Sequence, residues 1–304
     1  MPKYLNRKVG YQIPSPTQYQ YPKLETFSFV KMHGCSNDYI FFDEFDREIP
    51  EPEKIAGWLS DRHTGIGGDG IVLISPSEVA DAKMRMFNPD GSESGMCGNS
   101  VRCVGKYLYE RGRVVKPAME IETLSGNKQL DLIINDDGEV TAVRVDMGIA
   151  RTKPEEIPVN LPGATIVGRE VHITSQPIEI TCVNMGNPHT VIFHDDIEHF
   201  DLHTIGPIFE NASIFPERTN LDVAQILGRN NIAMRVWNRG TGETMADGTG
   251  ACAVAVAAVM MGYCDKDTDI NVQVKGGLLT IKYTDEAVYM TGNCVKVFEG
   301  TVPI

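Results

Sequence analysis

Two short turns hold the residue types best suited to proton-transfer chemistry: Cys97 in "SGMCGNSVRC" and Asp247 in "MADGTGAC". Each stands just before a predicted helix, one starting near Gly98 and the other near Gly248. Free N–H groups and the helix dipole attract anions, so a thiol there is more often ionised and a substrate carboxylate can bind. If both turns face one cleft, Cys97 and Asp247 could remove and return the α-proton of a bound carboxylate from opposite sides.

Each residue also has a common structural explanation. A buried cysteine is usually an inert small hydrophobic residue. An aspartate before a helix is usually an N-cap that accepts backbone hydrogen bonds. The turns alone therefore favour a structural role for both residues, and a catalytic role needs support from the rest of the chain.

The elements that must position these turns are mostly strands. Two apolar segments, beginning near Gly98 and Gly248, predict buried helices that end near a glycine, and residues 53–62 predict an amphipathic helix. Short apolar or alternating runs between turn residues predict strands at 27–32, 39–45, 70–75, 83–87, 119–123, 130–134, 142–146, 178–183, 190–193, 233–237, 272–274 and 278–283.

The two halves of the chain resemble each other. "MCGNSVRC" in the first half corresponds to "ADGTGAC" in the second, and "HGCSNDYIFF" corresponds loosely to "NMGNPHTVIF". Each half is rich in strands and has one long helix after a glycine-containing turn. The repeat predicts two similar α+β domains that meet around a cleft, a favoured position for a ligand.

Composition narrows the range of partners. The 304 residues, 42% of them apolar, suffice for one large or two ordinary domains, and the net charge of −13 makes nucleic acid a poor partner. No apolar run reaches the ~20 residues that span a bilayer. Seven cysteines without CxxC pairs predict reduced thiols in a cytoplasm and no zinc site. Residues 1–25 lack the apolar run of a signal peptide and predict an N-terminal arm.

Seven collinear stretches resemble the diaminopimelate epimerase family, over roughly residues 27–304. Seven motifs in the same order are far more specific than any single one. They are "KMHGCSNDYIFFD", "DRHTGIGGDGIVLISPS", "MRMFNPDGSESGMCGNSVRC", "VNMGNPHTVIF", "FPERTNLDVAQI", "RVWNRGTGETMADGTGACA" and "VYMTGNCVKVFEG".

The resemblance implies an amino-acid epimerase that inverts an α-carbon, with LL-diaminopimelate to meso-diaminopimelate as the first choice of reaction. In that family two cysteines act as thiolate base and thiol acid on opposite faces of the α-carbon, without pyridoxal phosphate, other cofactor or metal, and Cys97 matches one of them. The family fold has two pseudo-symmetric domains, each a curved, mostly antiparallel sheet wrapped around a central helix. It predicts a first domain of residues 26–146 plus 292–304, a second of 147–291, and a homodimer.

Binding residues follow from the same resemblance, one position at a time. Asn37 matches a residue near the reacting amino group. Arg239 matches one that holds the far end of the substrate, which suits a guanidinium as a bidentate carboxylate donor. Other matches at the far end are Asn88, Asn187 and Asn220, and those in the helix-end carboxylate cradle are Gly98, Asn99, Gly248 and Thr249.

Three departures from the family pattern matter. Asp247 stands at the position of the second cysteine. Asn238 stands where a glutamate usually helps to bind the distal ammonium, so one electrostatic reason to prefer that ammonium is absent. Ser36 and Ser100 replace glycines, and Ser100 adds volume beside Cys97.

Asp247 has several interpretations. A carboxylate is a competent base, but an ordinary aspartic acid, with a pKa of about 3.9, is scarcely protonated at neutral pH, so a Cys/Asp pair should be directionally unequal. The alternatives are a racemase of a different amino acid, a proton-shift isomerase like those of phenazine biosynthesis, and a catalytically inactive binding paralogue. Asp247 could also be a deliberate replacement of the cysteine, but one engineered residue would not explain the second altered position, Asn238.

Overall fold

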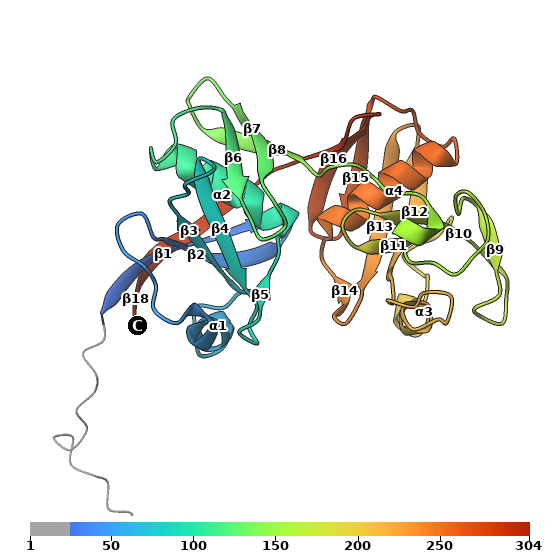
Figure 1. The fold of residues 1–304 in the computed structure, drawn as a ribbon, viewed down its shortest axis with the longest axis horizontal. Helices are drawn as coiled ribbons and strands as arrows, with labels where there is room; N and C mark the ends of the chain where they lie inside the picture. Colours follow the sequence, from blue (N-terminus) through green and yellow to red (C-terminus); the bar gives the residue numbers. More distant parts are fainter. Residues whose placement is uncertain (1–24) are drawn as a thin grey trace, which may run out of the picture.

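The computed structural model describes residues 25–304, and the predicted N-terminal arm lies outside them except for its last residue. Two lobes of similar build lie side by side, each with strands around one long helix (Figure 1). The C-terminus returns to the first lobe, where Ile304 and Glu25 exchange backbone hydrogen bonds. Within the described residues, no helix is both long and apolar enough to cross a membrane.

The first lobe begins with an antiparallel hairpin and ends with a strand that pairs with the second lobe. Its elements are β1 (Thr26–Gly34), β2 (Asn37–Asp43), α1 (Pro52–Ser60), β3 (Ile71–Ser75), β4 (Ala82–Phe87), β5 (Glu93–Ser94), α2 (Gly98–Glu110), β6 (Ala118–Glu122), β7 (Lys128–Ile134) and β8 (Val140–Asp146). The last strand of the chain, β18 (Val295–Pro303), pairs antiparallel with β1.

The second lobe repeats this order. Its elements are β9 (Arg169–Val171), β10 (Ile178–Asn184), β11 (Pro188–Phe193), α3 (Leu202–Glu210), β12 (Asn220–Gly228), β13 (Asn231–Asn238), β14 (Gly242–Thr244), α4 (Gly248–Met260), β15 (Asp269–Val274), β16 (Gly277–Tyr283) and β17 (Val288–Gly292).

Strand pairing makes the repeat explicit. In the first lobe β2 runs parallel to β3 and β4 parallel to β6, and in the second β11 runs parallel to β12 and β13 parallel to β15. The other pairings in both lobes are antiparallel, and an antiparallel pair, β8 with β17, connects the two lobes. The predicted α+β fold of two pseudo-symmetric domains is confirmed, whereas the residue limits of those domains stay a prediction.

A buried helix fills the centre of each lobe. From Ala251 to Ala258 every side chain of α4 is completely buried, and a helix that is apolar on all sides must be covered on all sides. Helix α4 accordingly packs against β10, β11, β12, β13, β15, β16 and β17, and α2 packs against β1, β2, β7 and β8. The sheets therefore curve around the two helices and fix the position of both helix starts.

The lobes also touch closely at a turn that positions one candidate site residue. Cys35 and Ser36 join β1 to β2 with φ angles of 52° and 64°, as a two-residue hairpin turn requires, and Ser36 thus occupies a conformation that favours glycine. A Cβ atom on Gly276 of the second lobe would lie 1.9 Å from the Cys35 carbonyl oxygen, so only glycine permits this approach. The turn places Asn37, the next residue, at the boundary between the lobes.

Some elements were not predicted. Helix α3 was missed because Pro207 interrupts its apolar pattern. Strands β5 and β14 are too short to show a period, and the first five side chains of β18 are all exposed, without alternation. The remaining strands missing from the prediction are β9, β12 and β17.

Candidate active site

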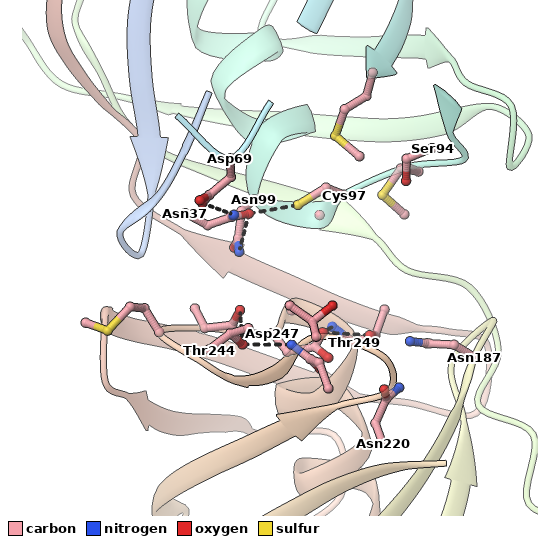
Figure 2. Close-up of a pocket in the computed structure, with 18 of the residues that line it drawn as sticks. Asn37, Asp69, Ser94, Cys97, Asn99, Asn187, Asn220, Thr244, Asp247 and Thr249 are labelled. Atoms are coloured by element: carbon pink, nitrogen blue, oxygen red, sulfur yellow. Dashed lines mark hydrogen bonds between the residues drawn. The ribbon is translucent and has the colours of Figure 1, made fainter. Parts of the chain in front are cut away.

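A cleft of about 1370 Å³ lies between the lobes. In Figure 2, Cys97 with Asn37, Asp69 and Asn99 lies on one wall, and Asp247 with Thr249, Asn187 and Asn220 lies on the other. Every site residue predicted from the sequence lines this cleft: Asn37, Asn88, Cys97, Gly98, Asn99, Asn187, Asn220, Asn238, Arg239, Asp247, Gly248 and Thr249.

Cys97 is the N-cap residue of α2, and its side chain makes no capping hydrogen bond. Its half-buried thiol instead donates to Asn37 Oδ1 at 3.1 Å. The first N–H groups of α2 therefore remain available to an anion that enters the cleft. Ser100, expected to add volume beside the thiol, is fully buried and donates to the Cys97 carbonyl oxygen at 2.9 Å.

A carboxylate fixes the orientation of Asn37. Its Nδ2 donates to Asp69 Oδ2 at 2.7 Å, and Asp69 also accepts hydrogen bonds from Asp38 N and from Arg62. Because a carboxylate only accepts hydrogen bonds, the amide nitrogen of Asn37 must face Asp69, and its oxygen faces Cys97. The Asn37 oxygen is therefore the atom that accepts from the Cys97 thiol.

Asn99 has a similarly fixed side chain. Its Oδ1 accepts from the guanidinium of the fully buried Arg102 at 3.0 Å, and its Nδ2 points to Asn37 Oδ1 at 3.4 Å. Arg102 therefore places positive charge behind the start of α2, where it adds to the field of the helix end.

Asp247 is the N-cap residue of α4, in the position equivalent to Cys97. Its Oδ1 accepts three hydrogen bonds, from Thr249 N at 2.9 Å, Thr249 Oγ1 at 2.7 Å and Gly250 N at 3.2 Å. No protein donor contacts its Oδ2 within the described part of the chain. The half-buried carboxylate thus has one fully engaged oxygen and one oxygen available to a ligand.

The predicted distal residues differ in how far protein contacts already engage them. Asn220 is nearly fully engaged, since it accepts from Arg239 N at 2.8 Å and donates to the Pro188 carbonyl oxygen at 3.1 Å. The Arg239 guanidinium is held by one hydrogen bond to the Glu217 carbonyl oxygen, at 2.7 Å, which leaves donors for a substrate carboxylate.

Three other predicted side chains make one polar contact each. Asn88 donates to Ser92 Oγ at 3.0 Å, and Asn238 donates to Thr244 Oγ1 at 2.7 Å. Asn187 Oδ1 lies 3.1 Å from His189 Nε2. The amide atoms that make no contact with the protein can therefore form hydrogen bonds with a polar ligand in place of water.

Sequence reasoning missed several polar residues of the site. Asp69 follows a glycine pair and had no predicted role, and Tyr39 lies beside Cys97, where burial and the thiol raise the pKa of its hydroxyl. Asp222 lies behind His189, in the apolar strand β12. A single acidic residue between Leu221 and Val223 was the only signal for it, and its partner depends on strand register.

Among residues 25–304, no three His, Cys, Asp or Glu side chains gather in a way that could hold a metal ion. All seven cysteines are outside disulfides, and Cys97 is the one that is not buried. The arrangement that remains is a thiol and a carboxylate on opposite walls, each at the start of a helix.

Comparison with solved structures defines the class of fold. A phenazine biosynthesis protein of the PhzF family from Bacillus anthracis superposes with a TM-score of 0.67 at 19% identity, covering 92% of this chain and 100% of that chain. A likeness at this identity concerns the fold alone, an architecture of two pseudo-symmetric domains.

Closer relatives define the family. The diaminopimelate epimerases of Desulfovibrio desulfuricans and Acetivibrio thermocellus are 50% and 48% identical to this chain. The alignments cover 90% of this chain and 96% of the first relative, and 91% of this chain and 98% of the second. The family profile for diaminopimelate epimerase matches residues 29–153 and 181–297. The chain belongs to the diaminopimelate epimerase family.

Proposed function

We propose that this protein is a cofactor-independent isomerase that converts LL-diaminopimelate to meso-diaminopimelate, with Cys97 and Asp247 as the proton-transfer groups. One observation supports this most strongly: both residues occupy the N-cap position of the central helix of their lobe, on opposite walls of one cleft. The two relatives are diaminopimelate epimerases and align with this chain over nearly their whole length, which supports the choice of substrate.

The proton states of the two groups complement each other. Asp247 Oδ2 removes the α-proton as a carboxylate, and the Cys97 thiol delivers a proton to the opposite face. Charge then resides on Cys97 sulfur, and Asp247 is protonated. Return of a proton from Asp247 to the solvent, and of one from solvent to Cys97, completes the cycle, and the same steps reversed convert meso to LL substrate.

The carbanionic intermediate needs electrostatic stabilisation, which the start of α2 supplies. A substrate carboxylate bound at the N–H groups of Gly98 and Asn99 would share the developing negative charge with the helix dipole and with Arg102 behind it. At α4 the donors of Thr249 and Gly250 are already bonded to Asp247. The α2 end is therefore the stronger half of the proposed carboxylate cradle.

The distal end of the substrate would contact Arg239 and the neighbouring asparagines. Asn238 is neutral and uses its amide nitrogen for Thr244, so its carbonyl oxygen is the group that can accept from the distal ammonium. That contact is weaker than one with a glutamate. A panel of amino acids with other distal groups therefore belongs in the test of substrate choice.

We also propose that the protein works in the cytoplasm as a homodimer. Seven free thiols suit a reducing compartment. Val295, Val297 and Phe298 on β18 are exposed at 39%, 54% and 46%, which suits a contact with a second copy. Light scattering during size-exclusion chromatography tests the dimer, and a monomer at micromolar concentration would contradict it.

Proton NMR in deuterated water with LL-diaminopimelate tests the function directly. The α-proton signal should disappear as meso-diaminopimelate forms, and Cys97→Ala should abolish both changes. If the α-proton exchanges but no meso isomer forms, only one of the two proposed proton-transfer groups is active. Exchange with another amino acid, and none with diaminopimelate, would reject the substrate. Absence of exchange across the panel would reject the isomerase.

A further inference from the structure

Behind Asp247 lies a buried pair of ionisable residues that no catalytic step has yet used. His189 is in β11 and Asp222 is in the adjacent parallel strand β12, and His189 Nδ1 lies 2.8 Å from Asp222 Oδ2. Both side chains are completely inaccessible to solvent. Burial of such a pair costs more than an apolar pair of similar volume, so its presence calls for an explanation other than stability.

The pair is connected to Asp247 through one hydroxyl group. His189 Nε2 lies 3.0 Å from Thr249 Oγ1, and Thr249 Oγ1 lies 2.7 Å from Asp247 Oδ1. Thr249 has a single hydroxyl proton, and the Asp247 carboxylate can only accept it. The Thr249 oxygen must therefore accept a hydrogen bond from His189, which requires a proton on Nε2.

The second neighbour of His189 Nε2 leads to the same tautomer. Asn187 Oδ1, 3.1 Å away, is also an acceptor. His189 Nδ1 and Asp222 Oδ2 are also within hydrogen-bond distance, so a second proton lies between these two atoms. Asp222 thus holds the ring in the one orientation in which it can donate to Thr249.

Charge in this group is balanced within the protein interior. Burial disfavours the imidazolium, but Asp222 and Asp247 outweigh it and raise the pKa of His189; burial also raises the pKa of Asp222. The raised pKa values of His189 and Asp222 both favour a proton that is shared by the two side chains. Asp222 Oδ1 has no hydrogen-bond partner and lies 2.5 Å from where a Cβ atom on Gly250 would be, so Gly250 allows this carboxyl to lie under the first turn of α4.

We propose that Asp222 and His189 are positioning residues for Asp247. Asp222 orients His189, His189 orients the Thr249 hydroxyl, and that hydroxyl fixes Oδ1 of Asp247. Oδ2 is then held toward the cleft as the proton-accepting atom. The inference rests on the proposed function for its consequence in catalysis, but the coupling itself exists without substrate.

Histidine NMR tests the coupling in the resting protein. In protein with ¹⁵N-labelled histidine, the slowly exchanging N–H signals that His189→Gln removes belong to His189. We expect Asp247→Asn and Thr249→Val to shift the Nε2–H signal, and Thr249→Ser, which keeps the hydroxyl, to restore its position. A signal that is insensitive to Asp247→Asn would overturn the proposed coupling.

Steady-state kinetics tests the consequence for catalysis, with a matched control in the same lobe. Asp196 and His199 form an exposed pair with the same 2.8 Å separation between Nδ1 and Oδ2. We expect Asp222→Asn to lower kcat about 10- to 100-fold, the usual loss for a partner behind a functional group, with KM within about threefold. Asp196→Asn should change neither constant.

The outcomes separate this inference from the proposed function. If the wild-type protein has no epimerase activity but the His189 signal still responds to Asp247→Asn, the proposed function fails and the coupling stands. If the protein is an active epimerase and a folded Asp222→Asn keeps its kcat, the positioning role is overturned. If Asp222→Asn does not fold, Thr249→Val takes its place, and an unchanged kcat in that variant would overturn the role equally.

Discussion

The two helix starts are built on the same plan but present opposite chemistry to the cleft. In each lobe, a residue of one antiparallel hairpin, β1–β2 in the first lobe and β10–β11 in the second, connects the helix N-cap to a carboxylate behind it. In the first lobe Asn37 links Cys97 directly to Asp69. In the second lobe His189 occupies this place, and it reaches its N-cap through a hydroxyl group.

The difference between the two linkers matches the difference between the two N-cap residues. Asn37 offers an acceptor oxygen to the Cys97 thiol, which donates to it. The Thr249 hydroxyl and two backbone N–H groups offer donors to Asp247, whose carboxylate oxygen accepts from all three. An aspartate at one N-cap and a cysteine at the other are therefore compatible with one site, because each lobe offers hydrogen-bond partners that suit its own residue.

The largest effect should come from neutralising the second N-cap. Asp247→Asn keeps the size and the capping acceptor but removes the base, and we expect kcat for inversion to fall about 10²- to 10⁴-fold. Asp247→Cys, in contrast, makes the two lobes chemically alike and should retain measurable inversion. Loss of activity in both variants, with helix content unchanged by circular dichroism, would indicate that the lobe needs a carboxylate and not merely an acid/base group.

A smaller loss is expected when the linker of the first lobe is disturbed. Asp69→Asn allows the Asn37 amide to turn, so that its nitrogen can face the thiol in place of its oxygen. We expect kcat to fall about 10- to 100-fold with KM nearly unchanged, as for other groups one contact away from the chemistry. Steady-state kinetics with each epimer as substrate provides the measurement. A kcat equal to that of the wild type would show that Asn37 keeps its orientation without Asp69.

The sequence predicted both N-caps but neither of the carboxylates behind them. Cys97 and Asp247 stand out because a small-residue turn precedes an apolar helix, and such a pattern is local. Asp69 and Asp222 acquire a role only through strand pairing, which brings residue 69 next to 38 and strand β12 next to β11. Helix α3 is a different case, since Pro207 hides its apolar pattern, and its equivalence to α1 is visible only once the strand order of the two lobes is known.

Asn238 offers a way to test whether the second lobe has also changed its preference for substrate. Asn238→Glu adds a charge that can pair with the distal ammonium, and we expect KM for LL-diaminopimelate to fall about 3- to 10-fold, roughly 1 kcal/mol. Asn231→Glu, at the exposed far end of the same strand, adds equal charge without touching the cleft and should leave KM unchanged. A KM that rises in Asn238→Glu would favour a substrate without an ammonium at that position.

The smallest effect concerns stability and compares equivalent ion pairs in the two lobes. Arg85 and Glu93 join β4 to β5 at 2.7 Å, and Arg235 and Glu243 join β13 to β14 at 2.8 Å, in each case before the turn that leads to the central helix. The side chains of the first pair are 37% and 27% exposed, and those of the second pair only 10% and 7%. Burial opposes ionisation of Glu243, but Arg235 and Lys275 outweigh it and lower its pKa to about 2.

A lowered pKa in the folded state adds stability above the unfolded value of about 4.3 and loses it as the pH falls toward the folded value. We therefore expect Glu243→Gln to reduce the free energy of unfolding by about 2–3 kcal/mol at pH 7, and the deficit to shrink between about pH 4.3 and pH 2. Glu93→Gln should cost less than about 1 kcal/mol, because an exposed pair is screened by solvent. Urea unfolding of both variants at pH 7, 5 and 3.5 measures the difference. Equal losses in the two lobes, or a Glu243→Gln deficit that does not change with pH, would mean that burial of the second pair contributes nothing to holding the turn before Asp247.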